Sequence, residues 1–90
     1  MIQPKTRKRA LHRAKIIRGQ IDGLIRAIEA EKYCVDVLTQ SLAVQQSLKS
    51  LDALMLENHL TVHVPHQLNN PKEQSKAIKE LLHLYRLSGK

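Results

Sequence analysis

The sequence predicts an all-α protein. Apolar residues recur at three- and four-residue spacing over long stretches, and Gly and Pro number only three each in 90 residues. No repeat, low-complexity tract or linker divides the chain. We therefore expect a single domain over residues 1–90, built from three helices.

The first helix is expected from about residue 5 to about residue 30. Pro4 suits a first helical turn, because its fixed φ matches the helix and its missing N–H has no partner there. The apolar stripe of this helix consists of Leu11, Ala14, Ile17, Ile21, Leu24, Ile25 and Ile28. Its end is weakly marked, because residues 29–34 contain neither Gly nor Pro.

The second helix is expected from about residue 34 to about residue 64, where Pro65 stops it. Its periodic positions are Val35, Leu38, Leu42, Gln45, Leu48, Leu51 and Met55. A helix of this length spans about 45 Å, more than the other two helices can cover. Antiparallel self-association into a helical bundle with two-fold symmetry would cover the remaining apolar face.

The third helix is expected over residues 71–87. Asn70 is a suitable N-cap, Pro71 occupies the first position and Glu73 follows three residues after the cap. Its apolar stripe consists of Ala77, Ile78, Leu81, Leu82 and Tyr85.

The net charge of +7 is concentrated at one end of the chain. The first 18 residues carry seven basic residues and no acid, whereas the rest carries eight of each sign. Such a segment favours a polyanionic partner, with a solvated helix face as the simpler alternative. Because Tyr33 and Tyr85 are the only aromatic residues, there is no stacking platform for single strands, and double-stranded DNA is the better prediction. The residues expected to contact its phosphates are Lys5, Arg7, Lys8, Arg9, Arg13, Lys15 and Arg18.

Cellular location is indicated by two features. Cys34 is the only cysteine, which excludes a disulfide framework and suits a reducing compartment. No apolar run approaches the roughly 20 residues of a membrane span. We expect a cytoplasmic protein that does not act at a membrane.

Cys34, His59 and His63 are the candidate metal ligands. His59 and His63 are four residues apart and therefore share a helical face, although two histidines at this spacing are often solvated surface residues without a ligand role. Cys34 lies about 38 Å from His59 along a straight helix. If two copies of the second helix pack antiparallel, Cys34 of one chain falls beside the two histidines of the other. One sulfur and two nitrogens suit Cu(I), or Zn, Ni or Co with further ligands such as His66.

An enzyme is not expected. The residue after His59 is Leu60, whereas a zinc metalloprotease has a glutamate there as general base. The sequence also lacks a Gly-rich phosphate loop and a carboxylate pair near the histidines. For His12 and His83 we expect plain surface positions.

The chain resembles the copper-sensitive operon repressor family, CsoR/RcnR, over nearly its whole length. The resemblance rests on residues 18–23 (RGQIDG), 33–37 (YCVDV), 43–45 (AVQ) and 55–60 (MLENHL). It implies a three-helix protomer, an antiparallel dimer with a four-helix core, and a tetramer made of two dimers. It also implies a repressor whose apo form binds operator DNA and releases it when an effector binds at the subunit interface.

The resemblance further implies roles for individual residues. The first two metal ligands fall on Cys34 and on His59 of the opposite protomer, while Tyr33 and Glu80 match positions that support the site through hydrogen bonds. Most copper sensors have a cysteine where this chain has His63, so the ligand set is Cys-His-His. The nickel and cobalt branch recruits a histidine near the N-terminus, where residues 1–4 have none. The formaldehyde branch has a glutamate at the position of His63.

A second departure concerns DNA. One basic residue implicated in operator binding matches Arg13, but another falls on Ser50, where the neighbouring Lys49 is the expected substitute. Three alternatives stay open at this point: a sensor of Ni(II), Co(II) or Zn(II), a sensor of an electrophile at Cys34, and a metal-storage protein without DNA regulation.

Overall fold

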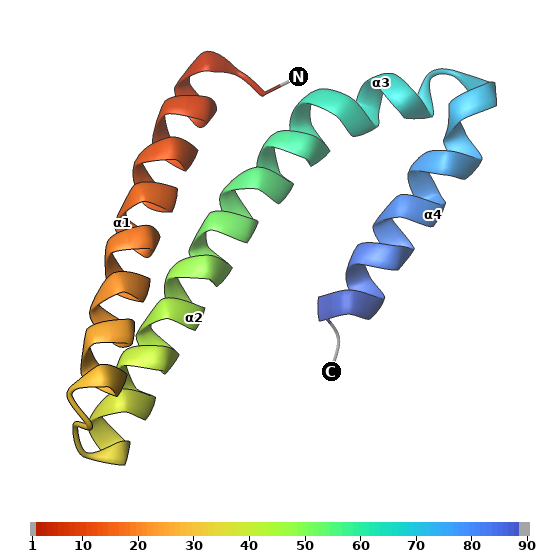
Figure 1. Cartoon of the computed structure of the whole chain (residues 1–90). Coiled ribbons are helices and arrows are strands. Elements are labelled where there is room, and N and C mark those ends of the chain that lie inside the picture. The colour runs from red at the N-terminus through yellow and green to blue at the C-terminus, as the bar shows by residue number, and fades with distance from the viewer. Residues whose placement is uncertain (1, 89–90) are drawn as a thin grey trace. The chain divides into compact units, whose positions relative to one another are not determined.

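The computed structural model describes residues 2–88. Along the chain it contains α1 (Pro4–Glu29), α2 (Cys34–Asn58), a π-helical turn η1 (His59–His63), α3 (Val64–Leu68) and α4 (Pro71–Ser88) (Figure 1). Residues 2–88 contain no strand, so the all-α prediction is confirmed. The chain divides into two compact units, Ile2–Leu56 and the part from Glu57 onward.

The first unit is a helical hairpin in which α1 and α2 run antiparallel (Figure 1). Its buried apolar side chains are Ile17 and Ala27 from α1 and Val44 and Leu54 from α2. α1 begins at Pro4, one residue before the expected start, after an extended Gln3 whose carbonyl accepts the amide of Arg7 at 2.8 Å.

The turn between α1 and α2 is closed without glycine. Glu31 adopts a left-handed conformation with φ 52°, and its amide donates to the Ile28 carbonyl at 3.0 Å. The amide of Lys32 donates to the Ala27 carbonyl, also at 3.0 Å. These two bonds form a Schellman motif, whose left-handed position is usually glycine. The end of α1 is therefore not marked by a glycine in the sequence.

The predicted apolar stripes lie largely outside the core of the hairpin. Of the seven stripe residues in α1 only Ile17 is buried, and Ile25 and Ile28 are exposed. In α2, Val35, Leu38 and Leu42 are each more than half exposed. The periodicity thus marks the faces that this chain leaves open, rather than the faces with which α1 and α2 cover each other.

The sequence predicted that Pro65 ends the second helix, but the structure shows that helical structure continues through Pro65. The α-helical part of α2 ends earlier, at Asn58, and helical structure continues through η1 into α3 as far as Leu68. A proline in a regular helix crowds the carbonyl four residues before it, here Thr61, and donates no bond to it. In the wider turn η1, the amide of Val64 instead bonds the His59 carbonyl five residues back. We attribute this turn to Pro65.

The second unit packs α3 against α4. The start of α4 is as predicted: the Asn70 side chain accepts the Lys72 amide at 3.0 Å, and Pro71 is the first helical residue. Val64 of α3 and Ala77 of α4 are buried. Among residues 2–88, no helix is both long and apolar enough to cross a lipid bilayer.

The left-handed Glu31 yields a stability prediction. A residue with a side chain destabilises the folded state by about 1–2 kcal/mol in the left-handed conformation. Glycine avoids this cost, but its greater entropy in the unfolded state cancels about 0.5–1 kcal/mol of the gain. Glu31→Gly is expected to be more stable than Glu31→Ala by about 0.5–1 kcal/mol in urea unfolding at equal protein concentration. Both variants lack the carboxylate, so the comparison isolates the backbone; equal stability would contradict the assignment.

Candidate metal and DNA-binding sites

His59 and His63 form a pair on η1. Their ring centroids are 5.2 Å apart with the planes tilted by 41°, and both side chains are partly buried. The prediction that the two rings share one face assumed a regular α-helix, whereas in the structure they lie together in a π-helical turn. Because a metal ion lies about 2 Å from each coordinating imidazole nitrogen, rings at this separation are close enough to share one ion.

The local environment favours the neutral form of His63. Desolvation lowers its pKa below the ordinary 6.5, and the nearby His59 acts in the same direction. A neutral imidazole is the form that coordinates a metal, so His63 need not lose a proton first at neutral pH.

His59 also lines a hollow of about 820 Å³ in the second unit. The other lining residues all belong to α4: Lys72, Ser75, Lys76, Lys79, Glu80, His83 and Leu84. The structure thus brings Glu80, which the family resemblance assigned to support of the site, to the same hollow as His59. Sequence reasoning missed His83 and the lysines here, although the spacing 72, 76, 79 and 83 is that of one helical face.

Cys34 is the first residue of α2, and its thiol is free and exposed. The preceding Tyr33 is 72% exposed, and its carbonyl accepts the amides of Asp36 and Val37 as the helix begins. His12 on α1 is exposed, as expected for a surface position, and His66 on α3 is exposed as well. Within the described part of a single chain, no group of three or more His, Cys, Asp or Glu residues is arranged to hold a metal.

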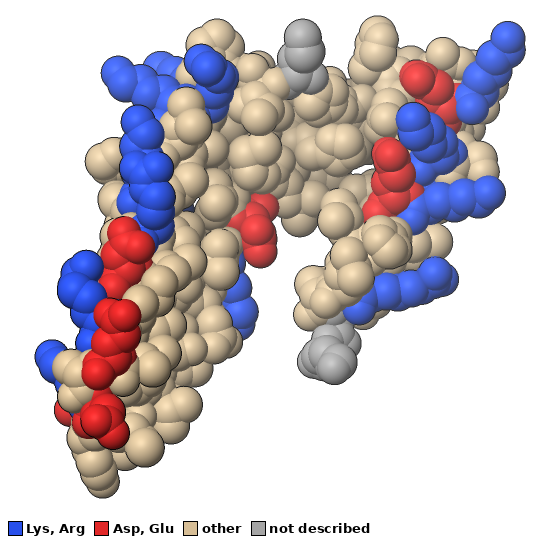
Figure 2. All heavy atoms as spheres, in the orientation of Figure 1, with Lys and Arg blue, Asp and Glu red and all other residues tan. Residues whose placement is uncertain are grey.

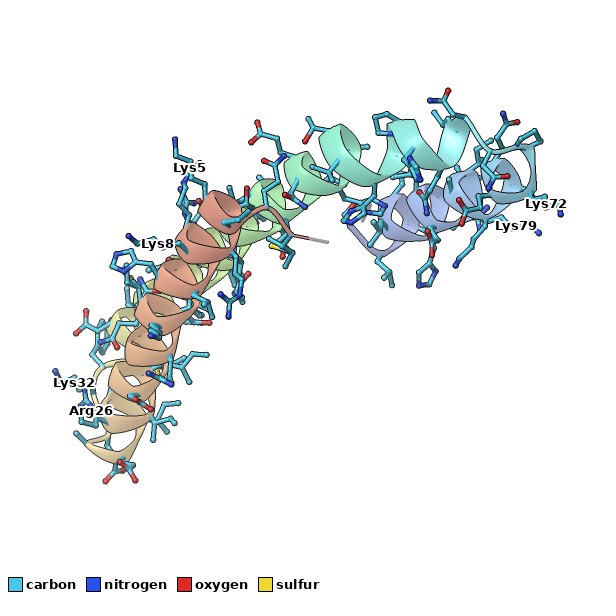
Figure 3. The ribbon with its side chains drawn as sticks, turned by 90° about the horizontal axis from the view of Figure 1, so that it is seen from above. Lys5, Lys8, Arg26, Lys32, Lys72 and Lys79 are labelled. Carbon is cyan, nitrogen blue, oxygen red and sulfur yellow. The ribbon has the colours of Figure 1, made fainter. Side chains whose placement is uncertain are left out.

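The basic residues predicted to bind DNA extend along α1. Blue side chains cover the part of α1 nearest the N-terminus (Figure 2), and Lys5 and Lys8 both project outward there (Figure 3). Arg13 differs from the other six because it is half-buried, and its guanidinium donates a hydrogen bond to the Ser50 hydroxyl on α2. Lys49, beside Ser50, is exposed. The two positions singled out by the family resemblance therefore meet across the hairpin.

Comparison with known proteins identifies similar regulators. Residues 6–86 match the family described as metal-sensitive transcriptional repressor. A copper-sensing transcriptional repressor CsoR from Bacillus subtilis is 33% identical over 82 residues, which cover 91% of this chain and 80% of that protein. CsoR from Mycobacterium tuberculosis is 48% identical over 54 residues, 60% of this chain. That match covers 45% of the mycobacterial protein, so the chain spans about half of its length.

Two solved structures share the fold. The copper-sensing repressor CsoR with Cu(I) from Geobacillus thermodenitrificans has a TM-score of 0.85 at 25% identity, over 98% of this chain and 91% of that one. A glutamate-to-histidine variant of the formaldehyde-responsive regulator FrmR from Salmonella enterica has a TM-score of 0.82 at 34% identity. That match covers 94% of this chain and 96% of the other.

The lowered pKa of His63 predicts a pH dependence of stability. Because the folded state binds a proton on His63 less readily than the unfolded state, stability is full above pH 6.5 and is lost as the pH falls through the lower folded value. Urea unfolding of the metal-free protein between pH 7.5 and 5 is expected to show this loss, and His63→Gln should reduce it. An unchanged pH dependence in His63→Gln would contradict the assignment.

Proposed function

Because this chain belongs to the metal-sensitive transcriptional repressor family, whose members are repressors and not enzymes, we propose that it is a copper-responsive repressor. In this proposal the metal-free protein binds operator DNA in the cytoplasm. Cu(I) binding to Cys34 of one protomer and to His59 and His63 of another then releases the DNA, which derepresses genes for metal efflux or homeostasis.

The observation that carries the proposal is the pairing of His59 with His63 on η1, together with a free, exposed thiol at Cys34. A thiolate and two imidazoles are soft to borderline ligands, which fit three-coordinate Cu(I). When bound, the metal supplies a coordinate link between the two protomers. The Cys34 thiolate and the neutral imidazoles act as electron-pair donors, and Tyr33 and Glu80 orient them through hydrogen bonds.

Subunit assembly is supported by the exposed apolar faces. Val35, Leu38 and Leu42 lie on α2 beside Cys34 in sequence, and Ile25 and Ile28 lie at the end of α1. Covering such side chains gains about 25 cal/mol per Å² of apolar surface removed from water. We propose an antiparallel dimer that buries these faces in a four-helix core, and a tetramer of two such dimers, with residues 1–90 acting as one metal-sensing and DNA-binding domain.

Operator binding is assigned to the basic side of α1. The exposed cations contact phosphates, and Lys49 of α2 extends the same surface. Arg13 is preset by its hydrogen bond to Ser50. Repression and release are two states of one equilibrium, and metal shifts it only through its different affinity for them. A coupling of about 1–3 kcal/mol per site is ordinary for allostery.

A second candidate effector is a small electrophile. One structural neighbour is named for its response to formaldehyde, and Cys34 offers an accessible sulfur nucleophile. Release by Ni(II), Co(II) or Zn(II) would keep the same site with a different metal. A metal-storage protein would use the same ligands but would have no use for the basic side of α1.

The effector is tested by anaerobic fluorescence anisotropy on the protein bound to duplex DNA from upstream of its own gene. About one Cu(I) per protomer is expected to release the DNA from the wild type and not from Cys34→Ala. Ni(II), Co(II), Zn(II) and formaldehyde are added separately for comparison. If the protein binds DNA tightly and neither Cu(I) nor any of the other three metals changes that binding, metal sensing is refuted.

The DNA surface is tested through the salt dependence of binding. Each phosphate contact contributes about 0.9 to the slope of log affinity against log salt concentration. Arg13→Ala is therefore expected to weaken operator binding and to lower the magnitude of that slope by about 1. Arg86→Ala removes an exposed charge from α4 as the matched control and should leave the slope unchanged. Equal effects of the two variants would mean that only net charge matters.

A further inference from the structure

The hollow beside His59 has an unbalanced charge. Its lining includes Lys72, Lys76 and Lys79 but only one acid, Glu80. All three lysines are exposed and, within the described chain, none of them forms an ion pair. Lys72 and Lys79 extend from the same side of α4 (Figure 3). One side of the hollow is therefore a row of uncompensated positive charge.

The residues next to Cys34 in sequence carry a net negative charge, although Arg26 in the last turn of α1 lies at the same end of the hairpin (Figure 3). Residues 29–36 contain Glu29, Glu31 and Asp36 against a single basic residue, Lys32. Acidic side chains gather toward the end of the α1–α2 hairpin where the chain turns (Figure 2). The Schellman bonds hold this turn in one conformation, and all three acids are exposed. We refer to residues 29–36 as the acidic turn.

We propose that the basic side of α4 in one protomer receives the acidic turn of a second copy of this chain, and that this docking delivers Cys34 to His59. The inference rests on the proposed inter-subunit metal site. It adds the surface that guides the thiol to the histidines, and it assigns the row of lysines to a partner protomer rather than to DNA.

The acidic turn lies close to Cys34 along the chain, and the lysines of α4 lie close to His59. Glu31 is three residues from Cys34, so its backbone lies within about 10 Å of a thiol placed at His59. The lysines line the same hollow as His59. A protomer that places Cys34 at His59 therefore brings acids and lysines within the Debye length at 0.01 M salt, which is roughly 30 Å, whereas roughly 8 Å at physiological salt screens much of their attraction.

Charge complementarity at this range has two consequences. It favours this register of the two protomers before any metal binds, because a register that brings like charges together is opposed. It also raises the effective concentration of the thiol at the two imidazoles, so the apparent Cu(I) affinity contains the docking equilibrium. Both the dimer affinity and the Cu(I) affinity should then weaken as salt is added.

The test is a charge swap in the full chain, without DNA. One variant carries Lys76→Glu with Lys79→Glu, a second carries Glu29→Lys with Glu31→Lys, and a third carries all four changes. Dimer dissociation constants of the metal-free proteins are measured by sedimentation equilibrium at low salt. Cu(I) affinities are measured by competition with a chromophoric Cu(I) chelator. Arg86→Glu, on α4 but outside the hollow, is the control, and circular dichroism checks that each variant remains helical.

Each double variant is expected to weaken both affinities by about tenfold, and the fourfold variant to return to within about threefold of the wild type. Recovery would not follow if the single effects came from misfolding. Unchanged dimer and Cu(I) affinities in the lysine variant would overturn the proposal, and a loss of DNA affinity alone would assign the lysines to phosphates. If the charge swap changes the dissociation constant of the metal-free dimer but Cys34→Ala leaves the Cu(I) affinity unchanged, the docking surface is supported and the proposed metal site is rejected.

Discussion

The constraint on which the structure depends is that the chain cannot cover its own apolar faces. The hairpin buries Ile17, Ala27, Val44 and Leu54, yet leaves long stripes on both of its helices exposed. In our proposal the remaining burial comes from a second copy of the chain. The proposed metal ligands are divided in the same way, because the thiol belongs to the hairpin and the imidazoles belong to the second unit. In our proposal one contact therefore completes both the core and the site.

Pro65 links the backbone to the chemistry. A regular helix would meet a steric clash at this residue, and the chain avoids it with a wider turn immediately before the proline. That turn contains both histidines, and the hydroxyl of Thr61 in it donates a hydrogen bond at 2.8 Å to the carbonyl of Glu57 near the end of α2. The two imidazoles are thus held on a segment whose shape we attribute to Pro65, which has no metal-binding side chain of its own.

Sequence reasoning succeeded where local chemistry is decisive and failed where it is not. Pro4, Asn70 and Pro71 mark helix starts by rules that need no tertiary context, and the all-α class followed from periodicity. The end of α1 was poorly marked because Glu31 occupies a position that usually signals itself as glycine. The charged row on α4 was missed because charges were counted along the chain, where Glu73 and Glu80 offset them, rather than around the helix. The ligand set of Cys34, His59 and His63 stays a prediction, because in the proposal its members come from different chains and the structure describes one chain.

The wide turn also bears on how relatives of this chain should be aligned. A turn closed by a bond to the fifth preceding residue holds one residue more than an α-helical turn. A relative without a proline at this position could lose one residue between Asn58 and Val64 and close a regular helix, with the facing of α3 kept. In this chain the same deletion would return Pro65 to a regular helix and to its clash with the carbonyl four residues before it. The additional residue and the proline are therefore expected to occur together among relatives, whereas a one-residue gap in the middle of α2 would rotate everything after it by about 100°.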